Sequence, residues 1–149
     1  MDDSLATMDT LLRALGERLG MALAADDEGA CGLRIDGRLL VTLECKPRTQ
    51  TLLVSADAGE LPGEGAEPVL RSLLAHNHLW EGSAGATWSL RGDTLVLMRR
   101  HRLEALDVDV LLGELARFVD AARREQDHAL AAPAAGHTGA ALPPGMVAA

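Results

Sequence analysis

The chain has 149 residues, 48% of them apolar, and its 22 acidic and 14 basic residues give a formal net charge of −8. This length predicts one domain that buries about two thirds of its unfolded surface. The negative charge disfavours nucleic-acid binding, while the acidic start MDDSLATMD and the absence of any apolar run near ~20 residues disfavour a secretory signal and membrane insertion. We therefore expect a cytoplasmic protein.

The first half of the chain predicts one helix and three strands. Ser4 is a good N-cap for an amphipathic helix that Gly20 can close. The stretches GLRID and RLLVTLEC flank Asp36-Gly37, which is typical of a two-residue hairpin turn. After Lys46-Pro47, TQTLLVSA predicts a third strand, and DAGELPGEGAE predicts a loop.

The two cysteines do not predict a disulfide framework. A two-residue turn at Asp36-Gly37 places Cys31 opposite Thr42 and sends Cys45 to the other face of the sheet. We interpret both cysteines as small buried apolar residues.

The segment EPVLRSLLAHNHLW, from Glu67 to Trp80, predicts a second helix. Pro68 suits its first turn, and Asn77 suits a left-handed closing residue. Its apolar side chains span an arc of about 140°, whereas one packing partner needs a stripe of ~100°. We therefore expect two partners, the sheet of the same chain and a second copy of the chain. The predicted dimer interface is made by Val69, Leu70, Leu73 and Leu74.

The second half ends with two strands and a helix. ATWSL and TLVLMRR are joined by a tight turn at Gly92-Asp93, and Asp107 can cap an amphipathic helix. The predicted order, α-β-β-β-α-β-β-α, indicates an α+β domain with a twisted antiparallel sheet over residues 1–127. Residues 128–149 are rich in Ala, Gly and Pro and predict a disordered tail.

Turn registers sort the strand residues into two faces. The Gly92-Asp93 turn pairs Trp88 with Leu97, and we expect the helices to cover that face. The opposite face is less polar than a solvated sheet and predicts a binding surface for a partner. Its expected contact residues are Leu33, Ile35, Leu40, Leu53, Val96 and Met98. Two alternatives stay open: the first helix or the tail covers this face, or a three-residue turn at Asp36 flips the first strand.

No arrangement of residues predicts catalysis, a cofactor or a metal site. His76 and His78 lie about 200° apart on a helix and cannot share a metal ion, so we interpret them as solvated, and His101 follows two arginines at a strand end. The GSAG stretch at residues 82–85 has no phosphate-loop spacing, and the chain has neither a GxSxG nor a CxxC motif. We expect a protein that is not an enzyme.

Several stretches, in this order, resemble class I type III secretion chaperones, the CesT-like (Tir chaperone) family of small acidic cytoplasmic proteins. They are LLRALGERLG, LLVSADAGELP, LLAHN and WSLRGDTLVLMRRHRLEALDVDVLLGELARFVDAA. The resemblance implies a homodimer formed through the second helix. It also implies that the dimer binds the N-terminal segment of a secreted effector in extended form, keeps it soluble and promotes its delivery to the secretion ATPase or sorting components.

Two other hypotheses remain at this stage. The same fold could serve a regulatory or structural interaction protein with no secretion client. A small-molecule enzyme or ligand-binding domain would instead show one closed pocket with convergent polar groups.

Overall fold

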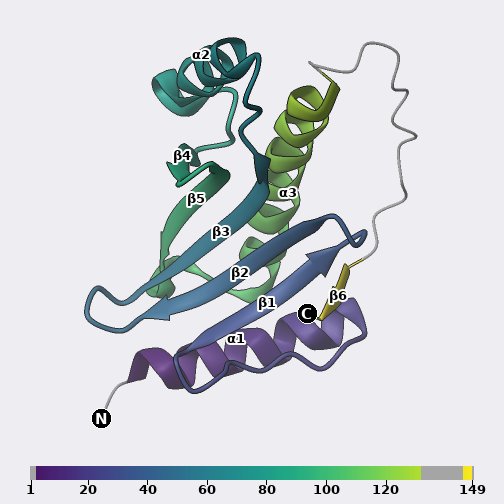
Figure 1. Ribbon diagram of the computed structural model, residues 1–149. Coiled ribbons are helices and arrows are strands. Elements are labelled where there is room, and N and C mark those ends of the chain that lie inside the picture. Colours follow the sequence, from purple (N-terminus) through teal and green to yellow (C-terminus); the bar gives the residue numbers. More distant parts are fainter. Residues whose placement is uncertain (1–2, 132–145, 149) are drawn as a thin grey trace.

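The computed structural model describes residues 3–131 and 146–148, and it confirms the α+β class and the order of the elements (Figure 1). Five long or medium strands and three helices follow the predicted sequence order. The elements are α1 (Asp3–Leu19), β1 (Ala30–Ile35), β2 (Leu39–Lys46), β3 (Thr51–Glu60), α2 (Ala66–Asn77), η1 (His78–Trp80), β4 (Thr87–Arg91), β5 (Thr94–Arg102), η2 (Leu103–Ala105), α3 (Val108–Ala131) and β6 (Met146–Ala148).

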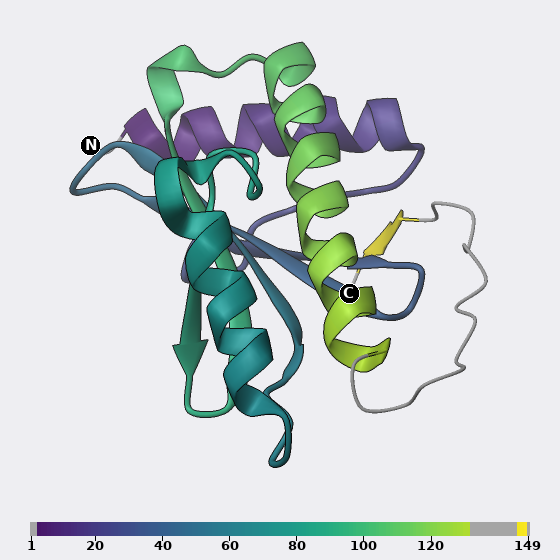
Figure 2. The same cartoon turned by 90° about the horizontal axis from the view of Figure 1, so that it is seen from above.

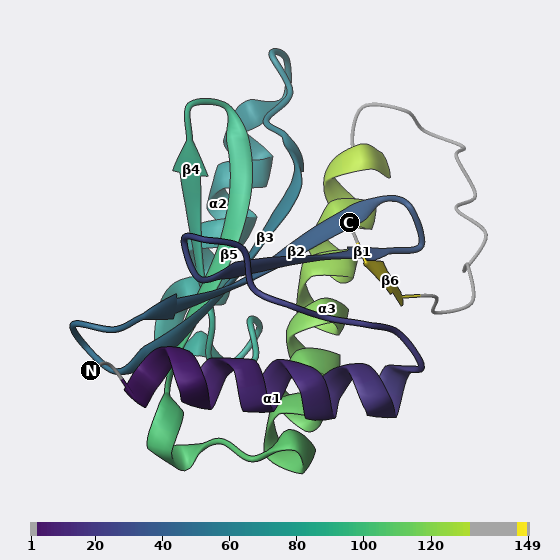
Figure 3. The same ribbon diagram turned by 90° about the horizontal axis from the view of Figure 1, so that it is seen from below.

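The strands form one antiparallel sheet in the order β4-β5-β3-β2-β1-β6. Helix α3 crosses the sheet at β3, and α2 packs against β4 (Figures 1 and 2). Seen from below, the strands lie in front of both helices (Figure 3). Helix α1 packs against α3 and β2, so one face of the twisted sheet carries the helices, and the other face has no helix from the described residues.

The helix-covered face forms a continuous apolar core. The predicted pairing of Trp88 with Leu97 is confirmed, as is the pairing of Leu90 with Leu95 across the Gly92-Asp93 turn. Helical periodicity supplies the other half of this core, because residues three and four apart lie on one face of a helix. The buried residues include Met8, Leu12, Leu15, Leu39, Val41, Leu43, Leu52, Val54, Trp88, Leu97, Leu111, Leu115 and Phe118.

The register of the first hairpin differs from the two-residue prediction. Asp36 and Gly37 do form the expected turn, since both have positive φ and the N–H of Arg38 donates to the carbonyl of Ile35 at 3.1 Å. The ladder resumes one residue later, with Ile35 opposite Leu39, so Arg38 is an extra, third residue of the turn, and the alternative of a three-residue turn at Asp36 is confirmed. A register shift of one residue exchanges the two faces of a strand.

Helix α3 accounts for this extra residue. Arg123 forms an ion pair with Asp36, Asp127 forms one with Arg38 at 3.2 Å, and the side chain of Gln126 donates to the Arg38 carbonyl at 3.3 Å. Three residues near the end of α3 therefore hold the turn. The sequence around the turn carries no trace of these distant partners.

The shifted register corrects three predicted placements. Leu33 and Ile35 lie on the helix-covered face and are completely buried, so they are core residues and not part of a binding surface. Cys31 lies opposite Leu43 and not opposite Thr42, which places it on the same face as Cys45, so the predicted separation of the two cysteines onto opposite faces is wrong. Both cysteines are buried as predicted, and burial raises the pKa of the Cys31 thiol.

The ends of two elements also differ from the prediction. Strand β3 continues to Glu60, four residues into the predicted loop, and α3 continues past Asp127 to Ala131. Within the predicted tail, Met146–Ala148 pair with β1 as strand β6. The remaining tail residues, 132–145 and 149, lie outside the described residues, and the domain boundary at 127 stays a prediction.

Candidate protein-binding surface

Helix α2 divides the four residues predicted for a dimer interface into two pairs. Val69 and Leu73 are buried in the core of the same chain and are not available to a partner, which corrects that part of the prediction. Leu70 is half-buried and Leu74 is 68% exposed. Beyond the helix, Leu79 is 66% exposed and Trp80 is 53% exposed. We call Leu70, Leu74, Leu79 and Trp80 the α2 patch.

Asn77 fixes the end of α2 against the sheet. Its side-chain oxygen accepts the Trp88 N–H at 2.7 Å, and its side-chain nitrogen donates to the Trp88 carbonyl at 3.1 Å. Its own φ is −69°, so the expected left-handed closing residue is not Asn77. The amide instead imitates a neighbouring strand and satisfies both backbone groups of one β4 residue. Sequence reasoning missed this role, because the partner is eleven residues away.

The left-handed conformation falls on the two residues that follow. Leu79 has φ 57° and Trp80 has φ 54°, a region that costs a non-glycine residue of order 1–3 kcal/mol. The Trp80 indole N–H donates to the hydroxyl of Thr87 at 3.1 Å, which fixes the ring over β4. The chain thus spends conformational energy to hold two large apolar side chains in solvent, as in a contact surface.

The face of the sheet without a helix offers a smaller apolar surface. Met98 lies opposite Thr87 on this face and is 36% exposed, and Leu40 and Leu53 are half-buried. Val96 lies on the same face but is only 4% exposed, so it supports its neighbours and offers little area to a partner. We call Leu40, Leu53 and Met98 the open-face residues.

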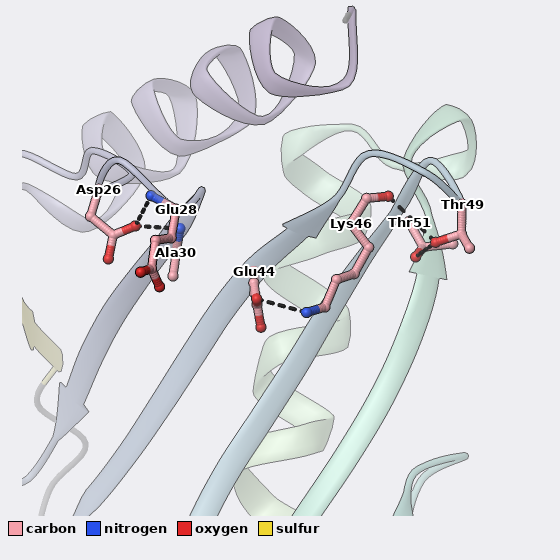
Figure 4. A network of polar contacts seen from close by, with 7 residues as sticks. All are labelled: Asp26, Glu28, Ala30, Glu44, Lys46, Thr49 and Thr51. Atoms are coloured by element: carbon pink, nitrogen blue, oxygen red, sulfur yellow. Dashed lines mark hydrogen bonds and ion pairs between the residues drawn. The ribbon is translucent and has the colours of Figure 1, made fainter.

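Charged residues surround the open-face residues. Arg91 forms an ion pair with Asp57 at 2.9 Å, and Lys46 forms one with Glu44 at 2.7 Å (Figure 4). Such half-exposed pairs add little stability, but they keep a solvated rim around an apolar centre. The face therefore suits a polar segment that carries a few apolar side chains.

A third apolar feature is an open groove between α1 and the start of α3. Its volume is about 660 Å³. It is lined by Asp3, Ala6, Thr7, Thr10, Leu11, Ala14, Leu106, Asp107 and Val108. Small residues at four-residue spacing, Ala6, Thr10 and Ala14, leave room for side chains of a partner. This spacing was the signal in the sequence that could have predicted the groove, which we call the α1 groove.

Polar contacts fix the helices that carry these surfaces. Arg99 of β5 bonds both Glu114 of α3 and the Ala84 carbonyl, each at 2.7 Å. Nδ1 of His76 on α2 lies 3.1 Å from a carboxylate oxygen of Glu125 on α3, without hydrogen-bond geometry, and that carboxylate is buried. His76 is therefore part of the α2–α3 contact, contrary to the expectation of a solvated side chain.

His101 lies half-buried at the end of β5. Burial lowers its pKa, and the positive charge of Arg99 lowers it further, while Glu114 acts in the opposite direction. Among the residues that the structure describes, no group of three or more His, Cys, Asp or Glu side chains could hold a metal ion. No helix in the described ranges has the length and apolarity needed to span a membrane.

Comparisons with known proteins point to one family. Residues 10–126 match the model of the Tir chaperone protein (CesT) family. No curated protein sequence matches the chain. Among solved structures, the fold is similar to a chain of the ExsC–ExsE complex, with a TM-score of 0.74, 25% identity, and coverage of 85% of this chain and 96% of that chain.

Two further structures share the fold. A chain of the HopA1–SchA chaperone–effector complex matches with a TM-score of 0.72 and 25% identity, over 85% of this chain and 98% of that chain. The Yersinia pestis type III secretion chaperone SycH, solved with a stable fragment of YscM2, is 22% identical, with a TM-score of 0.64 over 78% of this chain and 98% of that chain. At that identity the SycH comparison supports the fold alone.

Proposed function

Because the chain belongs to the Tir chaperone protein (CesT) family, we infer that it is a type III secretion chaperone. We propose that it acts in the cytoplasm as a homodimer that holds the N-terminal segment of a secreted effector in extended form. The family match over residues 10–126 carries this proposal. The work is done by binding alone, with no cofactor and no covalent step.

The α2 patch is the proposed dimer seam. Leu74, Leu79 and Trp80 are among the most exposed large apolar residues of the described chain, and they lie close together in the sequence, on α2 and on η1, which follows it directly. A symmetric contact places the same patch of both copies face to face. A stable interface of this kind buries about 1,200–2,000 Å² in total, with aromatic and aliphatic side chains at its centre.

The effector segment is proposed to cross the open face and the α1 groove. Leu40, Leu53 and Met98 provide shallow apolar contacts, and the α1 groove has the volume to receive larger side chains. Both features are open and elongated, whereas a small-molecule site is concave and closed. An extended peptide that gains contacts at several separate points is held without folding.

Co-expression tests this proposal. The chain is purified with candidate effector N-terminal segments, and the mass of each complex is read by light scattering. We expect a complex of two chaperone chains, each 15.7 kDa, with one effector segment. A dimer that retains none of the segments would favour a regulatory protein of the same fold, and a monomer would contradict the assignment of the α2 patch.

Matched variants separate the two surfaces. Leu74→Asp places a charge in the α2 patch and should yield a monomer, while Leu5→Asp, at another exposed helical leucine, should leave the dimer intact. Ala6→Trp fills the α1 groove and should weaken effector binding without changing the dimer mass. Asp9→Trp adds the same side chain to an exposed position of α1 outside the lining of the groove and should leave binding unchanged.

A further inference from the structure

The two edges of the sheet are closed in different ways. At the β4 edge, the side chain of Asn77 bonds both the N–H and the carbonyl of Trp88. At the β1 edge, the last strand of the chain, β6, pairs antiparallel with residues 33–35. An open edge accepts strands from other molecules, and proteins commonly block edges for that reason.

Alternation along β1 identifies the backbone groups that β6 covers. The N–H and carbonyl of one strand residue point to the same side, and successive residues alternate. Ile35 and Gly29 direct their carbonyls toward β2, where they accept from Arg38 and Cys45 at 3.1 Å and 3.0 Å. The N–H and carbonyl groups of even-numbered β1 residues therefore point away from β2, toward the edge of the sheet. Within the β6 pairing, Arg34, opposite Val147, is the residue whose backbone groups point this way.

The other end of β1 is closed by its own loop. The backbone groups of Ala30 also point away from β2, and both bond Asp26. The Ala30 N–H donates to the Asp26 carboxylate at 2.9 Å (Figure 4), and the Ala30 carbonyl accepts the Asp26 N–H at 2.8 Å. Asp26 and Asn77 are integral parts of the domain. Strand β6 is different, because it is three residues long and pairs only with β1 among the described strands.

We propose that β6 is a resident strand that occupies the place of an effector strand on β1, and that the effector displaces it. This inference rests on the proposed function, since it concerns the same client. Peptides bind open sheet edges by adding a strand, and their main-chain bonds require no particular sequence. A segment of the same chain is present at high effective concentration, so even a short strand keeps the edge covered until a longer strand replaces it.

The choice of β1 over β4 follows from what must be removed at each edge. To free Trp88, an incoming strand would have to detach Asn77 and with it the end of α2. To free Arg34, it only has to release three residues that pair with nothing else in the described chain. An effector strand that also reaches Gly32 would gain pairing that the short β6 leaves out.

Amide exchange on the full-length chain tests the resident strand without any client. Val147→Pro removes the N–H that faces Arg34, and Val147→Thr keeps it. In Val147→Pro, we expect the Arg34 amide to exchange about tenfold faster, while the Leu33 amide, which faces β2, is unchanged. Equal exchange of Arg34 in both variants would overturn the proposal, whatever the client does.

Binding of the effector segment retained in the co-expression experiment tests the displacement. Because β6 leaves the β1 edge available for only part of the time, release of β6 in Val147→Pro should lower the apparent Kd for the effector segment about three- to tenfold. The Kd of Val147→Thr should be unchanged. Equal Kd values in both variants would overturn the resident-strand proposal and leave the chaperone function standing. Failure of every variant to bind any segment would instead count against the proposed function, while the exchange result would still decide whether β6 covers the edge.

Discussion

Replacement of Asn77 should detach the α2 patch from the sheet. The amide makes two hydrogen bonds with the backbone of Trp88, a residue that is itself buried. An ordinary hydrogen bond contributes a net ~0.5–1.5 kcal/mol, and a buried group left without its partner costs ~1–3 kcal/mol. Asn77→Ala should therefore lower the free energy of unfolding by about 2–3 kcal/mol.

Asn77→Asp is the matched control, because a carboxylate still accepts the Trp88 N–H but cannot donate to the Trp88 carbonyl. We expect it to lose about 1 kcal/mol. The assay is urea unfolding at one fixed protein concentration, since a dimer adds a concentration-dependent term. A loss below about 0.5 kcal/mol in Asn77→Ala would refute the idea that this side chain fixes α2 to β4.

Three further outcomes follow from the described geometry. Burial lowers the pKa of His101, so the unfolded chain takes up a proton more readily than the folded chain, and the free energy of unfolding should fall as the pH drops below about 6.5. His101→Gln should reduce that fall in urea titrations. An unchanged pH profile in this variant would contradict the lowered pKa of His101. The Cys31 thiol, with its raised pKa, should react with a thiol reagent only as fast as the chain opens, so that immediate labelling of the folded protein would show the burial to be wrong. Leu97→Ala should cost about 2–5 kcal/mol and Met98→Ala under ~1 kcal/mol in the same unfolding assay, because these neighbours lie on opposite faces; similar losses would contradict the register of β5.

Local signals were sufficient where the determining contacts are local. The Gly92-Asp93 turn correctly predicted the pairing of Trp88 with Leu97. Asp107 caps α3 as expected, since its carboxylate accepts the N–H of Val110 at 2.8 Å. Both features depend on residues within ten positions of one another, which is the range over which turn and capping rules apply.

The register of β1 could not be obtained in this way. Asp36-Gly37 marked the position of the turn, but local rules left a two-residue and a three-residue turn both open. Arg38, the third residue of the observed turn, is held by side chains from α3, about ninety positions away. A shift of one residue then moved Leu33 and Ile35 from the expected binding face into the core. The open face kept Leu40, Leu53 and Met98, whose placement follows from β2, β3 and β5.

The apolar arc on α2 is divided in the structure in a way that the sequence did not predict. The arc exceeds what one packing partner needs, and the structure assigns Val69 and Leu73 to the core and leaves Leu74 outside. Helical periodicity cannot locate that dividing line, because it depends on how Asn77 fixes the helix on β4. The helix alone predicts that a second partner exists, and the tertiary contact determines which residues it meets.

The same reasoning explains why so small a domain keeps several apolar surfaces in solvent. One face of the sheet and the inner stripes of three helices are used for the core. The α2 patch, the open-face residues and most of the lining of the α1 groove lie outside that core. Separate, modest apolar surfaces cannot collapse onto one another. In the proposed function the α2 patch meets a second copy of the chain, and one extended segment bridges the open-face residues and the α1 groove, which it can reach together only while it remains unfolded. An architecture that leaves these surfaces apart therefore selects a client in extended form.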